Sequence, residues 1–207
     1  MAELGASLNQ EPQVLAINPQ YLSDVLEDIR RVGRATGKDP LAESLTAQLQ
    51  ARIDAVAANS SRAASRPRVL QLEWADPLMC GGHWVVEMVE LAGGTSCFGS
   101  KEQGSFRLEW PQVVASQREI ILLMPCGFDL NRAIEDVPLL THKEAWDSLP
   151  AVKNRRVYII DAAAYTSRLG PRLVTGLEIM AEIIHPELFS GMIPDGGAVQ
   201  LDNLVEG

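Results

Sequence analysis

The sequence has 207 residues, of which 46% are hydrophobic and 22% charged, the balance of an ordinary globular chain. Its 18 basic and 27 acidic side chains give a net charge of −9, which argues against binding to nucleic acid or to an anionic membrane, because both require a basic surface. The longest aliphatic run, Ile120 to Met124, is far too short for a membrane-spanning helix, which needs about 20 residues. We therefore expect no nucleic-acid partner and no membrane insertion.

Cysteine usage and the N-terminal residues bear on the cellular compartment. The cysteines Cys80, Cys97 and Cys126 are too few, and odd in number, for a disulfide framework, and they fit a reducing compartment. The start of the chain, MAELGASLNQ, has neither a basic flank nor an apolar core segment, so a secretory signal is not predicted. We expect a cytoplasmic protein, or a periplasmic one if a leader has been removed.

The N-terminal part of the chain predicts a strand followed by a helix, together residues 14–38. Residues 1–13 have no hydrophobic periodicity and are expected to be flexible. The apolar run Val14–Ile17 is typical of a short strand, and Asn18 and Pro19 are typical of a helix start. An apolar stripe at three- and four-residue spacing then predicts the helix, and its members are Leu22, Val25, Leu26, Ile29 and Val32.

A long connecting helix is predicted next, over residues 39–64. Asp39 and Pro40 repeat the helix-start pattern. A narrow apolar seam of nearly four-residue spacing follows and consists of Leu41, Leu45, Leu49, Ile53 and Val56. Such a helix would be about 30 Å long, the diameter of a small domain, so we expect it to act as a spine.

Strands and helices alternate over residues 65–188. Apolar runs predict the strands and three- to four-residue spacing predicts the helices, with a break at Pro138. The strands are 69–74, 106–108, 120–124 and 157–160, and the helices are 83–91, a short one from 111, 129–137, 142–148 and 170–184. The alternation predicts an α/β fold, a three-layer α/β/α lobe with a mainly parallel sheet behind the spine helix. Residues 189–207 are acidic and are expected to form a flexible tail.

Three loops follow predicted strands, at residues 75–83, 125–129 and 162–170. Ligands of parallel α/β sheets bind outside the carboxyl ends of the strands. These loops contain or adjoin aromatic and small residues, which can form a wall for a flat, partly apolar ligand because rings supply contact area at little entropic cost. Trp74 and Trp84 could instead be core residues, Trp84 because its spacing with its neighbours is helical.

The cysteines and histidines allow two further interpretations. Cys80 and His83 have the spacing of a metal-ligand pair. Cys97 or Cys126 would supply a third ligand, but confident zinc sites repeat such a pair and this sequence does not. A buried thiol and a helix-start histidine explain the same residues, so no metal site is predicted. Cys126 could also act as a nucleophile activated by His83 or His142, since it follows a strand and precedes a glycine.

The motifs of common enzyme classes are absent from the sequence. There is no G-x-S-x-G, G-x-G-x-x-G or G-x-x-x-x-G-K-[ST] pattern, so the usual hydrolase and nucleotide-binding interpretations lack support. Arg168 and Arg172 flank Gly170 and Pro171 at a predicted helix start. There they could hold an anionic group, or they could simply be solvated.

Four longer segments become informative when they are taken together. They are LNQEPQVLAINPQYLSDVLEDIRRVGRATG, VLQLEWADPLMCGGHWVVEMVELAGG, LMPCGFDL and LPAVKNRRVYIIDAAAYTSRLGPRLVTGLEIMAEIIHPELF. In this order they resemble segments of the cobalamin-type substrate-binding proteins of ABC importers, a family with two α/β lobes joined by one long helix. The resemblance covers about residues 9–189, chiefly the C-terminal lobe and the connecting helix.

The resemblance implies a function and a set of contact residues. In that family a corrinoid is held between the lobes, and strand-end loops of the C-terminal lobe form one wall. This implies a non-enzymatic ligand-binding protein that requires no cofactor, with cobalamin or a related corrinoid as its ligand. His83 could ligate cobalt, although a structural role at the helix start explains it as well. The implied ligand contacts are Trp74, Asp76, Pro77, Gly81, Gly82, His83, Trp84, Gly127, Phe128, Tyr165, Ser167 and Arg168.

Two departures from the family bear on transport. Most of the N-terminal lobe is missing, since only residues 14–38 precede the spine helix. Pro111 stands where family members present a glutamate to arginines of the membrane permease, and nearby Glu109 is the candidate partner-binding residue. We therefore do not expect ordinary import with permease docking.

Two alternative functions stay open from the sequence. The chain could be an interaction module that kept the fold and lost the ligand, forming a homodimer or binding a partner that supplies the missing lobe. It could also be a cysteine-dependent enzyme that uses Cys126.

Overall fold

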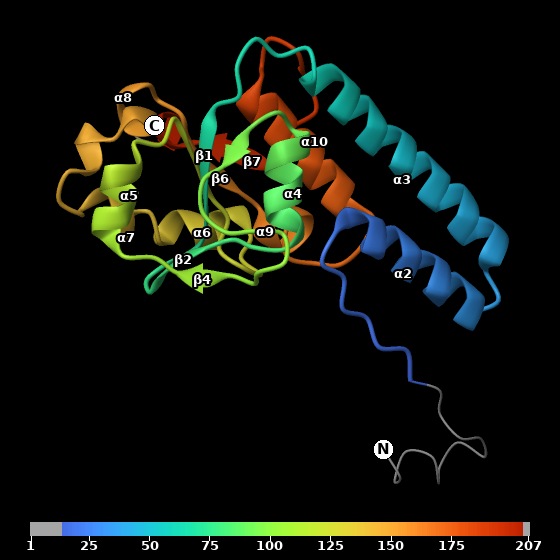
Figure 1. The fold of residues 1–207 in the computed structure, drawn as a ribbon. Coiled ribbons are helices and arrows are strands. Elements are labelled where there is room, and N and C mark those ends of the chain that lie inside the picture. Colours follow the sequence, from blue (N-terminus) through green and yellow to red (C-terminus); the bar gives the residue numbers. More distant parts are fainter. Residues whose placement is uncertain (1–13, 205–207) are drawn as a thin grey trace, which may run out of the picture.

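The computed structural model describes residues 14–204, and the predicted flexible segment 1–13 lies outside them (Figure 1). The strands are β1 (Arg68–Ala75), β2 (Leu78–Cys80), β3 (Thr95–Ser96), β4 (Phe106–Arg107), β5 (Ile120–Leu123), β6 (Val157–Ile160) and β7 (Ala198–Gln200). The helices are α2 (Leu22–Ala35), α3 (Asp39–Ser60), α4 (Trp84–Leu91), α5 (Trp110–Ser116), α6 (Leu130–Glu135), α7 (Pro138–Thr141), α8 (Pro150–Lys153), α9 (Ala162–Tyr165) and α10 (Arg172–Ile184), with 3₁₀ turns at Trp146–Ser148 and Leu201–Leu204. Every helix within this range is too short or too polar to traverse a lipid bilayer.

The strands form one open sheet with a parallel centre. Its order is β4-β2-β1-β5-β6-β7, with β3 beside the start of β1. β1, β5 and β6 are parallel neighbours, whereas β2, β4 and β7 run antiparallel to their partners. The α/β class is confirmed, but the sheet is mixed. The prediction of a mainly parallel sheet missed β2, which follows β1 after only Asp76 and Pro77, too short a connection for a parallel crossover.

Alternating side chains of the central strands bury both faces of the sheet. Ile120 and Leu122 pack in a cluster with α2, α3, α4 and α10, whereas Ile121 and Leu123 pack in a second cluster with α5 to α8. Successive side chains of a strand point to opposite faces, so a continuous apolar run requires cover on both sides. The predicted three-layer arrangement is therefore confirmed.

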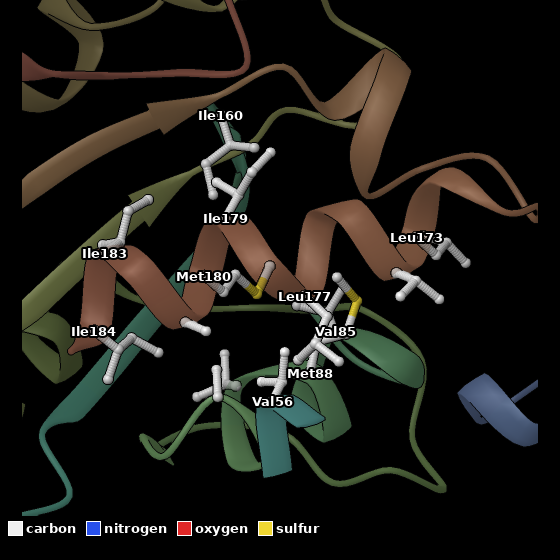
Figure 2. Close-up of a cluster of buried hydrophobic side chains, with 14 of the residues drawn as sticks. Val56, Val85, Met88, Ile160, Leu173, Leu177, Ile179, Met180, Ile183 and Ile184 are labelled. Atoms are coloured by element: carbon white, nitrogen blue, oxygen red, sulfur yellow. The ribbon is translucent and has the colours of Figure 1, made fainter. Parts of the chain in front are cut away.

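Helix α10 is the centre of the first cluster and is buried nearly all round. Figure 2 shows Ile179 pointing toward Ile160 of the sheet, and Leu177 lying on the side of Val85 and Met88. Arg52 of α3 ties the long helix to α10, because its guanidinium donates to both carboxylate oxygens of Glu178, at 2.8 and 2.5 Å. α3 covers the seam predicted to be helical, but it ends at Ser60 rather than at residue 64. Helix α2 lies beside it (Figure 1).

The predicted N-terminal strand is wrong. Val14–Ile17 pairs with no strand among the described residues, so its backbone has no sheet to join. Helix α2 also begins later than predicted, at Leu22, because Asp24 rather than Asn18 satisfies the free amides at its start. The Asp24 carboxylate accepts hydrogen bonds from the backbone N–H groups of Gln20, at 2.9 Å, and of Tyr21, at 3.1 Å.

The break predicted at Pro138 is present, because α6 ends at Glu135 and a separate helix, α7, begins at Pro138. Helical structure resumes at Pro138 itself, since proline lacks an N–H that the first helical turn would leave free. The helix predicted over 142–148 is reduced to the 3₁₀ turn Trp146–Ser148.

The predicted flexible tail, 189–207, is ordered as far as residue 204. Phe189 is 3% exposed, and the backbone N–H groups of Met192 and Ile193 donate to the carboxylate of Glu182, at 2.6 and 2.9 Å. β7 then pairs with the edge of β6. The acidic composition was misleading because a few apolar side chains and a free sheet edge fix this segment. Residues 205–207 lie outside the described range.

Gly176 lets α10 pass close to the loop that follows β6. A Cβ atom at Gly176 would lie 2.1 Å from the backbone oxygen of Tyr165, so this loop would have to move. Gly176→Ala is expected to lower the free energy of unfolding by roughly 1–3 kcal/mol, as overpacked cores do. Urea unfolding followed by circular dichroism measures the change. Gly170→Ala is the control, because a Cβ there meets no described atom within 4 Å. Equal stability of the two variants would contradict this packing.

Candidate functional site

The carboxyl ends of the three central strands lie level with one another. Leu72 of β1 is opposite Leu123 of β5, and Leu123 is opposite Ile159 of β6. The segments after these strands therefore emerge side by side at one edge of the sheet. The ring of Trp74, at the end of β1, contacts the ring of Phe128, after β5, with centroids 5.1 Å apart and planes at 83°. This edge-to-face pair is a favourable aromatic geometry, and it brings together two residues predicted as ligand contacts.

Gly127 and Ser167 join the second loop to the third. The backbone N–H of Gly127 donates to Oγ of Ser167 at 2.9 Å, and the N–H of Ala163 donates to the backbone oxygen of Phe128 at 2.8 Å. Gly127 has a φ of 78°, a left-handed conformation that costs glycine little and most other residues more. The loop that carries Phe128 is therefore fixed against the loop that carries Ser167.

The first predicted loop, residues 75–83, is mostly the β1–β2 hairpin. Asp76 and Pro77, joined by a cis peptide bond, form its exposed tip. Gly81 and Gly82 are buried, and a Cβ on Gly82 would lie 2.2 Å from the backbone oxygen of Gln103. These two glycines allow close backbone packing beneath the site rather than forming its surface.

His83 and Trp84 connect the first loop to the third. The two rings stack with centroids 5.9 Å apart, and the Trp84 indole N–H donates to the backbone oxygen of Thr166 at 2.9 Å. Trp84 is half-buried against the first core cluster, so it supports the third loop from below. His83 begins α4 with a φ of 50°, and its Nδ1 is buried without a hydrogen-bond partner in the described part of the chain. Within residues 14–204, no three His, Cys, Asp or Glu side chains are arranged to hold a metal ion.

Glu73 is a residue beside the site that sequence reasoning missed. Its carboxylate accepts a hydrogen bond from the Ser105 hydroxyl, and its backbone oxygen accepts one from the N–H of Cys126 at 3.1 Å. Burial raises the pKa of Glu73, while the bond from Ser105 and the nearby His83 oppose that rise. An acidic side chain in a strand usually marks the solvent face, so only its contacts reveal its position.

The third predicted loop, residues 162–170, begins as the short helix α9 and continues as a loop from Thr166. Tyr165 packs half-buried against the first core cluster, beside α10. Arg168 is exposed and lines a shallow hollow of about 210 Å³ together with Arg172 and Asp161. The Asp161 carboxylate accepts from the N–H of Ala164 at 2.8 Å. The two arginines predicted to flank an anionic group therefore do face one hollow.

Glu109 lies apart from this edge. It precedes α5 and its side chain is 74% exposed, 4.0 Å from Arg107. Figure 1 shows α5 well separated from α9, on the other flank of the sheet.

The rate of thiol modification should distinguish the loop residue Cys126 from the buried Cys80. Burial raises the pKa of the Cys80 thiol to about 12, so only roughly one molecule in 10⁴ is ionised there at pH 8. Burial also raises the pKa of Cys97, although the Arg118 guanidinium opposes this. Cys126 is exposed. Ellman's reagent at pH 8 should therefore show one fast-reacting thiol in the native protein, with Cys80 reacting only after denaturation. A fast phase that persists in Cys126→Ser would contradict this assignment.

Comparison of the sequence with known proteins identifies related proteins. The sequence model of the periplasmic binding protein family matches residues 6–164. The uncharacterized ABC transporter substrate-binding lipoprotein YvrC of Bacillus subtilis is 24% identical over 182 residues, which are 85% of this chain and 55% of YvrC. The chain thus spans about half the length of this curated relative.

Solved structures show the same fold. An ABC transporter substrate-binding protein from Listeria monocytogenes superposes with a TM-score of 0.73 at 18% identity, over 90% of this chain and 72% of that one. The periplasmic vitamin B12-binding protein BtuF of Vibrio cholerae superposes with a TM-score of 0.68 at 17% identity, over 89% of this chain and 69% of that one. The periplasmic heme-binding protein RhuT of Roseiflexus superposes with a TM-score of 0.67 at 25% identity, over 81% of this chain and 64% of that one. The resemblance seen in the sequence is confirmed, and the chain belongs to the periplasmic binding protein family.

Proposed function

We propose that this chain is a non-enzymatic ligand-binding protein of the ABC-transporter substrate-binding type, and that it binds a corrinoid such as cobalamin at the edge formed by Trp74, Phe128 and Tyr165. The observation that carries the proposal is the Trp74–Phe128 pair, which stands on two level strand ends. The Gly127–Ser167 hydrogen bond ties this pair to the third loop. Large rigid side chains on fixed loops suit a wide, rigid, partly apolar ligand, because little flexibility is lost when it binds.

The hollow beside Arg168 adds an electrostatic contribution to this surface. Two arginines and one aspartate, Asp161, line this hollow, so its net positive charge would attract an anionic group at the margin of the ligand. The phosphate of cobalamin has the required charge, and cobinamide, which lacks the nucleotide, does not. Arg168 therefore serves to distinguish these two corrinoids, whereas the aromatic pair would contact both.

The remaining predicted contacts take different roles in this proposal. Asp76 and Pro77 lie at the exposed hairpin tip, where they could touch the ligand margin. Gly81, Gly82 and Trp84 position the loops from below. Glu109 stays the candidate partner-binding residue, since it is exposed on a different flank and could be occupied while ligand is bound.

Titration calorimetry with cobinamide and cobalamin tests the ligand. Wild-type protein should show saturable binding of both, and Trp74→Ala or Phe128→Ala should weaken each by about tenfold, equivalent to roughly 1.4 kcal/mol. Arg168→Ala should weaken cobalamin more than cobinamide. Trp110→Ala is the matched control, because Trp110 lies on α5 and bonds to the backbone oxygen of Glu144.

Three results would count against the proposal. No saturable binding at high micromolar corrinoid would remove the ligand claim and favour an interaction module. Binding of hemin but not of corrinoids would support the proposed binding surface but contradict the proposed ligand class. Equal weakening by Trp110→Ala and Trp74→Ala would place the site elsewhere.

A further inference from the structure

A second cavity lies between α2 and the segment that leads into α10, on the side of the molecule where α2 is seen in Figure 1. It has a volume of about 260 Å³ and shares no lining residue with the hollow beside Arg168. A cavity of roughly 150 Å³ already accepts benzene, so this one has room for a fused ring pair. It is open to solvent beside Ile17, Val32 and Leu169, which are 41–43% exposed. Its lining residues are Ile17, Val25, Asp28, Ile29, Val32, Leu169, Gly170 and Pro171.

Asp28 is the only ionisable residue in this lining and stands on the apolar face of α2. It is 9% exposed, between Val25 and Ile29 and one turn before Val32. A carboxylate in apolar surroundings is costly unless its oxygens are hydrogen-bonded. The guanidinium of Arg31 donates to Oδ1 at 2.5 Å. The hydrogen bonds of residues 14–204 give Oδ2 no partner.

The surrounding charges define what could approach Oδ2. Arg31 already balances the charge of Asp28. The other charged groups nearby on α2 pair with one another or with α3: Arg34 with Glu27 at 2.7 Å, and Arg30 with Glu43 at 3.2 Å. A free acceptor oxygen in this apolar lining suits a neutral N–H or O–H donor better than a cation, which would compete with Arg31. Arg168 and Arg172, which flank the lining segment 169–171, would also repel a cation.

We propose that this cavity binds a small neutral aromatic or alicyclic molecule that carries one N–H or O–H group, with that group donating to Oδ2 of Asp28. The apolar lining supplies burial for the ring, and the carboxylate oxygen selects for the donor. The site is independent of the aromatic pair proposed for the corrinoid, so the two proposals can fail separately.

Indole and benzofuran form a matched pair of probes, because their shapes are nearly the same and only indole has an N–H. Saturation-transfer NMR with millimolar probe should show that wild-type protein binds indole at least fivefold more tightly than benzofuran. Asp28→Leu should abolish that difference, since it removes the acceptor while keeping the apolar face. Val32→Trp, at a residue 41% exposed, should fill the cavity and weaken both probes at least tenfold.

Trp74→Ala should leave indole binding unchanged, which separates this cavity from the corrinoid site. Absence of indole binding, equal affinity of the two probes for wild type, or unchanged binding in Val32→Trp would each overturn the proposal. So would a dimeric mass in light scattering that becomes monomeric in Val32→Asp, because a second copy would then cover the cavity.

Discussion

The parallel register of β1, β5 and β6 determines which loops meet at the proposed ligand-binding edge. Parallel pairing places Leu72, Leu123 and Ile159 level with one another, so the chain leaves all three strands at the same edge of the sheet. Trp74 and Phe128 can meet only because of this alignment. A shift of one residue would exchange the side chains that face the two core clusters, so the close packing of both clusters holds the register.

Polar contacts between the loops then fix their shape. The indole of Trp84 holds the third loop through the backbone of Thr166, and Ser167 holds the second loop through the N–H of Gly127. Helix α10 packs against the third loop at Tyr165, and Gly176 permits this close approach. Loops fixed in this way lose little conformational freedom on binding, which is the physical basis for assigning ligand contacts to them.

The elements with strong periodicity could be predicted from the sequence, and those that depend on tertiary contacts could not. The apolar seam of α3 repeats over many residues, and the apolar run of β5 is unbroken, so both elements could be predicted. The hairpin strand β2 and the tail strand β7 are short and acquire their structure from the neighbouring strands. The position of Glu73 beside the site could not be predicted for a similar reason, since its burial comes from residues distant in sequence, Ser105 among them. Trp74 and Phe128 were predictable as candidates, but their contact was not.

Hydrogen–deuterium exchange with and without cobinamide tests most directly whether the three strand ends form one ligand surface. Backbone amides in residues 74–83, 125–129 and 163–168 should become protected together, because one rigid ligand would contact all three loops. Peptides covering α5 and α8, on the other flank, should be unchanged. Protection confined to α5 and α8, or to only one of the three loops, would contradict this account.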